Sequence, residues 1–172
     1  AYNSVGQMHN SWYGKRYNEL VKLFNDMIPQ MNEMLTLVVT DIPFALETIA
    51  NNYAQADIGA NVTTANNEEP NKLINISMSN DIGMRFITSD VSATQKQVST
   101  NFNNAKDQMN KIEGTYNTIS WSSEAADAFR QKFSELKSSI VTSFETINTQ
   151  FTKLMTQTQQ DIDQSEKSNT VN

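Results

Sequence analysis

The sequence predicts an all-α protein, an elongated antiparallel hairpin or bundle of three long helices. Apolar residues recur every three or four positions along three long stretches, which is the helical period. Only 5 Gly and 3 Pro occur in 172 residues, too little turn chemistry for an all-β sandwich. Hydrophobic residues make up 38% of the chain, which suits long helices that bury a narrow stripe. We expect four-helix-like packing, with a position that a second chain can complete.

The first predicted helix runs from Trp12 to Asp57. Pro29 and Pro43 each remove a backbone N–H, so kinks are expected there, and Thr40-Asp41 offers an alternative N-cap and hence a break. The stripe stays in phase through both prolines, and its members are Leu20, Phe24, Met27, Met31, Leu35, Val38, Ile42, Ala45, Ile49 and Tyr53.

Residues 58–80 read as a linker, because Gly59, Pro70 and a run of Thr, Ala and Asn favour loop structure. A brief alternation, Ile74/Ile76/Met78, leaves a short extended piece open. The second helix is expected from about Asp81 to Asn117. Its stripe is nearly a heptad pattern, typical of a coiled-coil or hairpin seam.

The third helix is expected to run to about Glu166, with a polar tail to residue 172. Ser122 or Ser123 can cap it, and Glu124 in the first turn opposes the positive end of the helix dipole. We therefore divide the chain into 1–57, a partial first unit; 58–80, a linker; and 81–172, a complete helical hairpin that turns at Trp121.

The first and third stretches match each other without a gap. Trp121 follows Trp12 at an offset of 109 residues (121 minus 12), and eight apolar positions of the first stretch fall on apolar positions of the third. Leu20 falls on Phe129, for example, and Phe24 on Phe133. A match of this length indicates an internal duplication.

The composition argues against several classes of function. The net charge is −6 and the 13 basic residues are scattered, so nucleic acid is not expected as a partner. Cysteine is absent, His9 is the only histidine, and no phosphate loop, dinucleotide fingerprint or HExxH motif occurs. We expect no catalytic residues, no metal, no cofactor and no enzymatic activity.

Membrane partners are also not expected. No apolar stretch is long enough to span a bilayer, and residues 1–10 lack the basic and apolar blocks of a secretory signal peptide. If the protein is exported, another route must recognise it.

A helical hairpin with Trp-X-Gly at its turn, acidic and free of cysteine, resembles the WXG family of type VII (ESX-like) secretion substrates. The first copy shows Trp12-Tyr13-Gly14, and the second shows Trp121-Ser122-Ser123, with Ser where the family has Gly. The resemblance covers roughly residues 2–57 and 81–166. It implies a secreted or cell-surface protein of a Gram-positive bacterium, associated with virulence.

The family tends to carry Tyr-X-X-X-Asp/Glu at the end of the helix that follows the Trp, as an export signal. Here that position holds Tyr53-Ala54-Gln55-Ala56-Asp57, and a spacing of four places Tyr53 and Asp57 on one helical face. In the family, one hairpin's Trp turn approaches its partner's signal. Carried over, Trp121 would lie near Tyr53 and Asp57, forming a composite signal within one chain.

The resemblance also implies partners: the type VII secretion ATPase, and a second helical hairpin protein as a homodimer or heterodimer. Only eleven residues precede Trp12, too few for a complete first hairpin. Either the start is missing, or the bundle is three-helical, or a second molecule supplies the fourth helix. The expected seam and interface residues are Phe24, Leu35, Val98, Phe102, Phe129, Phe133 and Phe144.

The sequence therefore favours a non-enzymatic secreted helical protein that presents an export signal and acts as an effector or as a targeting or chaperone partner. Two alternatives stay open: a membrane-active helical toxin and a structural coiled-coil adaptor. In the adaptor reading, Trp12 and Trp121 only pack helix junctions, Tyr53 is a stripe residue and Asp57 a solvated acid.

Overall fold

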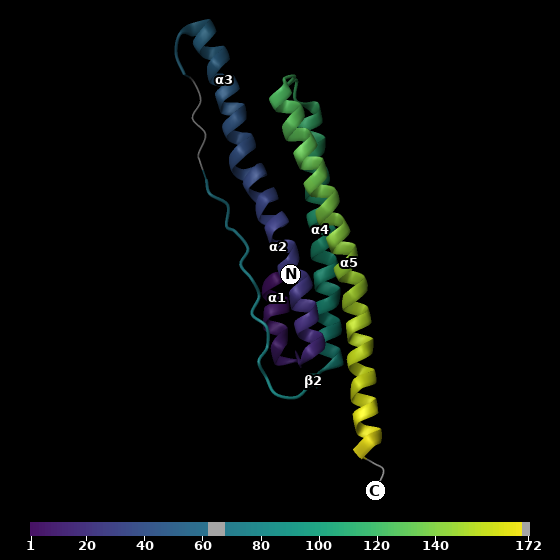
Figure 1. The fold of residues 1–172 in the computed structure, drawn as a ribbon. Coiled ribbons are helices and arrows are strands. Elements are labelled where there is room, and N and C mark those ends of the chain that lie inside the picture. Colours follow the sequence, from purple (N-terminus) through teal and green to yellow (C-terminus); the bar gives the residue numbers. More distant parts are fainter. Residues whose placement is uncertain (62–67, 170–172) are drawn as a thin grey trace.

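The computed structural model describes residues 1–61 and 68–169, and it confirms the all-α class (Figure 1). A short helix and a 3₁₀ turn come first, followed by a long helical column, an extended segment and two further long helices. The helical elements are α1 (Tyr2–Gln7), η1 (Met8–Asn10), α2 (Lys15–Thr36), the π-helical η2 (Leu37–Asp41), α3 (Ile42–Ile58), α4 (Thr88–Thr118) and α5 (Glu124–Asn169). Two short strands, β1 (Trp12–Tyr13) and β2 (Arg85–Phe86), pair antiparallel.

The molecule is elongated, and its long helices lie side by side (Figure 1). The column of α2, η2 and α3 runs in the same direction as α4, and α5 returns antiparallel to both. Both α2 and α4 pack against α5, so α5 is the helix they share. Its buried apolar residues are spaced by three, four and seven: Phe133, Ile140, Phe144, Ile147, Phe151 and Leu154.

The centre of the core is a stack of phenylalanines, one from each long helix. Phe102 of α4 lies parallel to Phe144 of α5, with ring centroids 4.1 Å apart, and Phe24 of α2 lies 5.8 Å from Phe102. All three rings are almost fully buried. The amphipathic stripes predicted from the sequence thus meet in one seam.

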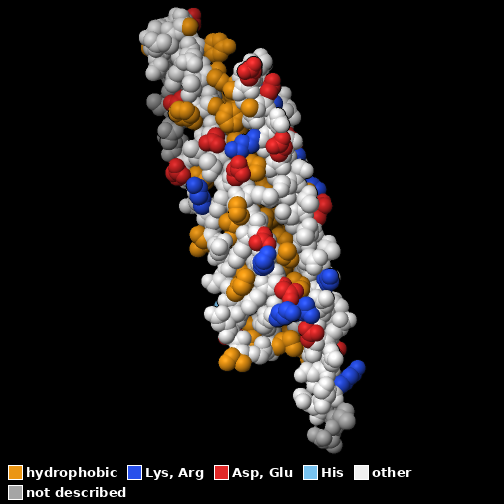
Figure 2. All heavy atoms as spheres, viewed as in Figure 1, with side chains coloured by type: hydrophobic (Ala, Val, Ile, Leu, Met, Phe, Trp, Pro, Cys, Tyr) orange, Lys and Arg blue, Asp and Glu red, His pale blue; other side chains and the backbone are white. Residues whose placement is uncertain are grey.

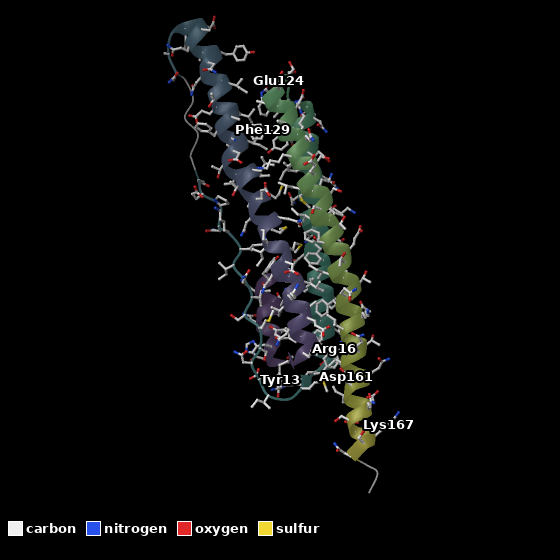
Figure 3. The ribbon with its side chains drawn as sticks, in the orientation of Figure 1. Tyr13, Arg16, Glu124, Phe129, Asp161 and Lys167 are labelled. Carbon is white, nitrogen blue, oxygen red and sulfur yellow. The ribbon has the colours of Figure 1, made fainter. Side chains whose placement is uncertain are left out.

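Trp12 organises the end of the molecule where β1 and β2 pair. Its side chain is 0% exposed and lies against Tyr17, Phe86 and Phe151, with centroid distances of 6.2, 5.5 and 5.9 Å. Arg16 and Asp161 face one another at the same end (Figure 3), with Nε and Oδ2 3.4 Å apart. This end therefore joins α2, β2 and α5.

The first predicted helix starts later than expected. Trp12 belongs to β1, and α2 begins at Lys15, because Gly14 adopts a φ of 113° that a helix cannot contain. The second helix also starts later, at Thr88 instead of Asp81. Gly83 has a φ of 94°, and β2 occupies the next residues, so the chain cannot be helical there.

The two prolines have different effects. Pro29 lies inside α2 without ending it, whereas Pro43 follows the π-helical turn η2. In an α-helix the Pro43 ring would clash with the carbonyl of Val39. The chain widens there instead, and the N–H of Ile42 reaches the carbonyl of Leu37, five residues back. The helix therefore continues through Pro43, with one extra residue in that turn.

Residues 70–80, here called the strap, contain neither helix nor strand and run along α2 toward β2 (Figure 1). Three asparagines of α2 bind the strap's main chain. The side chain of Asn25 donates to the carbonyl of Ile76 and accepts from its N–H, at 2.9 and 2.8 Å. Asn32 and Asn18 bind Leu73 and Ser79 in the same way, at distances of 2.7 to 2.9 Å.

The helix ends follow ordinary capping rules. The Ser123 hydroxyl accepts a hydrogen bond from the N–H of Ala126 at 3.1 Å, which is the predicted cap of α5. Gly59 ends α3 with a φ of 69°, the left-handed conformation that glycine supplies most readily.

The two tryptophans should contribute unequally to stability. Trp12 is fully buried and touches three rings, whereas Trp121 is only half-buried. We expect Trp12→Ala to lower the free energy of unfolding by about 3–5 kcal/mol and Trp121→Ala by about 1–2 kcal/mol. Urea unfolding followed by circular dichroism measures both. Equal losses would contradict this account of the core.

Stability should fall in alkali. Burial raises the pKa of Tyr2 and of Tyr17 above the ordinary value of about 10, so the folded state holds these protons more tightly than the unfolded chain. Their contribution is complete below about pH 10 and is lost as the pH rises further. We expect the unfolding free energy to fall as the pH rises above about 10, and to fall less in Tyr2→Phe/Tyr17→Phe. An unchanged slope in the double variant would refute this assignment.

Candidate functional site

The duplicated tryptophans lie at opposite ends of the molecule, because α2 and α5 run antiparallel (Figure 1). Tyr13, next to Trp12, marks one end in Figure 3, and Glu124 and Phe129, next to the Trp121 turn, mark the other. At the first end the Trp is sealed in the core. At the second end a cleft remains open.

The cleft lies between α3 and the turn that joins α4 to α5, and we call it the α3–turn cleft. Leu46, Ile49 and Tyr53 line it from α3, and Ile119 and Trp121 line it from the turn. Its volume is about 540 Å³. Two segments that are almost 70 residues apart in the sequence thus form one hollow.

Tyr53 is 75% exposed although its position continues the apolar stripe of α3. It lines the α3–turn cleft together with Trp121. Asp57 does not line this cleft. It is exposed one turn further along α3 and borders a shallower hollow with Tyr53. The fold therefore brings Tyr53 and Trp121 to one site and leaves Asp57 at its margin.

The surface around the cleft is unusually apolar. Within α3, all of which the structure describes, Ile42 is the only buried residue. Phe44, Tyr53 and Ile58 are 55%, 75% and 63% exposed. Hydrophobic side chains gather at this end of the molecule in Figure 2. Exposed aromatic and aliphatic side chains around a hollow are typical of a protein-binding surface.

The Trp121 turn is held by an arginine that sequence reasoning missed. The Arg130 guanidinium donates to the carbonyl of Trp121 at 2.8 Å and to that of Ile119 at 3.5 Å, and it pairs with Asp127 at 3.2 Å. The Trp121 ring lies 5.7 Å from Phe129. Arg130 lies nine residues after Trp121. That spacing belongs to no motif or apolar stripe, so the sequence alone did not identify Arg130.

The Trp121 indole N–H is buried and has no hydrogen-bond partner among the residues that the structure describes. A buried donor of this kind ordinarily finds an acceptor. Trp121 also lines the cleft. The N–H itself is shielded from solvent, so only the exposed part of the Trp121 ring is offered to a molecule in the cleft.

The third positions of the two Trp motifs differ for a local reason. Gly14 has a φ of 113°, and a Cβ there would lie 3.2 Å from the Gly83 carbonyl oxygen, so a side chain is disfavoured. Ser123 has no such constraint, and its hydroxyl caps α5. The Ser in the second copy suits a helix cap, and the Gly in the first suits a close approach of two backbones.

Most of the expected seam residues lie in the core. Phe24, Val98, Phe102, Phe133 and Phe144 are buried, and Phe129 is partly buried against the core.

Leu35 is the exception, because it is half-buried and does not belong to the core cluster. Met34 and Leu37 belong to the cluster in its place. The core cluster steps from Met27 to Met34 and Leu37 and then, across η2, to Ile42.

The residues that the structure describes include no group of three His, Asp or Glu side chains placed to hold a metal ion. His9 is exposed, and its Nδ1 lies 2.8 Å from the carbonyl oxygen of Gly6. Over the same residues, no helix combines the length and hydropathy needed to cross a bilayer.

Comparison of the chain with protein-family models, with curated proteins and with solved structures found no match in any of the three. The WXG resemblance therefore rests on the residues of the chain itself.

Arg130→Ala should loosen the Trp121 turn, because two carbonyl oxygens lose their shared donor. We expect a loss of about 1 kcal/mol, reduced from the usual value for a charged donor by partial exposure, and a red shift of Trp121 fluorescence in a Trp12→Phe background. Arg85→Ala, at an exposed arginine of β2, is the control. An unshifted emission in Arg130→Ala would show that the turn does not depend on this arginine.

Proposed function

We propose that this chain is a non-enzymatic substrate of type VII secretion that presents a composite export signal made of the Trp121 turn, Tyr53 and Asp57. The observation that carries the proposal is the exposure of Tyr53 in a cleft that it shares with Trp121. A tyrosine that served only the seam would be buried there.

The proposed partner is the secretion ATPase, and recognition would use three kinds of contact. The Tyr53 ring and the half-buried Trp121 ring provide apolar area with polar tips, which suits a binding hot spot. The exposed Asp57 carboxylate supplies a negative charge at the margin. The hydroxyl of Tyr53, a side chain that is 75% exposed, offers a hydrogen-bonding group.

Recognition requires only that a folded surface be offered, so the proposal assigns no chemical step to any side chain. After export, the proposed role is that of an effector or of a targeting partner for another protein. The apolar surface of α3 then becomes free once the export machinery releases it.

The test is export into the culture supernatant of a Gram-positive host with an active type VII system. We expect Tyr53→Ala and Asp57→Ala each to lower export at least about tenfold, because each removes a contact of the order of 1–2 kcal/mol. Thermal melts of the purified variants should stay close to that of the wild type, since both side chains are exposed.

Two matched substitutions complete the design. Ile82→Ala removes an exposed apolar side chain near β2, at the other end of the molecule, and Asp107→Ala removes an exposed acid of α4. Both should be exported normally. If all variants reach the supernatant equally, or if the wild type itself is not exported, the proposal fails and a structural adaptor becomes the better interpretation.

A further inference from the structure

The surface of α2 beneath the strap has a regular composition. Asn18, Val21, Asn25, Ile28 and Asn32 follow one another at steps of three and four, so they share one face of the helix. This face borders the core stripe. Val21, 0% exposed, belongs to the core cluster, whereas Ile28, 5% exposed, is buried outside that cluster, so burial on α2 extends past the core stripe toward the strap.

The spacing of the asparagines matches that of an extended chain. Seven helical residues advance about 10.5 Å, and three extended residues span about 10 to 11 Å. The asparagines are seven residues apart, and their partners Ser79, Ile76 and Leu73 are three apart in the opposite direction. One helix face can therefore hold successive triplets of an extended chain in register.

The three asparagines form these hydrogen bonds with main-chain atoms of the strap only. Each carboxamide both donates to a carbonyl and accepts from the N–H of the same strap residue. The identity of the strap residue does not enter these bonds. Selectivity comes from which residues turn inward, and here every third residue is half-buried: Pro70, Leu73, Ile76 and Ser79.

The strap has little else to hold it. Ile74 and Met78 are 83% and 48% exposed. Ile76 approaches α1, where its Cγ2 lies 3.7 Å from the Cβ position of Gly6. A hollow of about 530 Å³ lies between the strap and α1, which leaves room for side chains larger than those present.

We propose that the Asn18–Asn32 face of α2 is a binding surface for extended peptide segments, and that the strap is its resident intramolecular occupant. The partner that fits is an extended segment of another protein with an apolar or small uncharged residue at every third position, as in the strap. It would displace the strap, whose release leaves the seam of α2, α4 and α5 intact. This surface is separate from the α3–turn cleft, and the proposal does not depend on type VII export.

The test uses a labelled synthetic peptide of residues 68–82 and fluorescence anisotropy. In the full-length Leu73→Asp/Ile76→Asp protein the strap loses its inward apolar side chains, so the peptide should bind saturably. It should bind at least about tenfold more weakly to the wild type, because the tethered strap competes at a high effective concentration. Adding Asn25→Leu to the double variant should weaken binding at least about tenfold.

Two matched controls separate clamping from general stickiness. Asn103→Leu, at an exposed asparagine of α4, should leave peptide binding unchanged in the same background. A peptide N-methylated at Ile76 lacks the N–H that donates a hydrogen bond to Asn25 Oδ1, so it should bind weakly. N-methylation at Asn75 should have a smaller effect.

Three results would overturn the proposal. The first is the absence of saturable binding to the Leu73→Asp/Ile76→Asp protein. The second is binding that Asn25→Leu and the methyl group at Ile76 do not weaken. The third is loss of the helical circular dichroism signal in the Leu73→Asp/Ile76→Asp protein, because the bundle would then depend on the strap and could not release it.

Discussion

Burial of the α5 stripe between α2 and α4 is the interaction on which the rest of the structure depends. Each long helix has one narrow apolar stripe, and a stripe buries little area unless a partner follows it along its whole length. α5 is long enough to pair with both other helices at once. The stacked rings of Phe24, Phe102 and Phe144 mark the level at which all three stripes converge.

Closing the bundle has different consequences at its two ends. At the Trp12 end, α1 and the strands β1 and β2 cover the helices, so the Trp ring is excluded from solvent. At the Trp121 end, α3 fully buries Ile42 alone, keeps Leu46 and Ile49 half-buried, and exposes Phe44, Tyr53 and Ile58. The two sequence stretches that match each other begin at opposite ends of the molecule. The flanking segments decide which becomes a core and which becomes a cleft.

The face of α2 that carries Asn18, Asn25 and Asn32 explains how the strap stays ordered without helix or strand. The main-chain groups of an extended chain need partners, and ordinarily a neighbouring strand supplies them. Here three carboxamides at heptad spacing take that role for the inward side of the strap. The same arrangement makes the contact independent of side-chain identity, which is the physical basis for exchange with another segment.

The sequence by itself determined the helical class, the main stripes and a serine cap at residue 122 or 123, because these depend on local periodicity and on hydrogen bonds within a few residues. Three asparagines at heptad spacing, with Val21 and Ile28 between them, are also present in the sequence. Their role in binding the strap could not be predicted, since their partners lie more than forty residues away. Only the tertiary structure decided that Leu35 lies outside the core cluster, because Met34, Leu35 and Leu37 are all apolar and the packing of the neighbouring helices selects which of them are buried. It also decided that Tyr53 is exposed beside Trp121, because how closely α3 approaches the α4–α5 turn depends on the packing of three helices, and no short stretch of sequence records that distance.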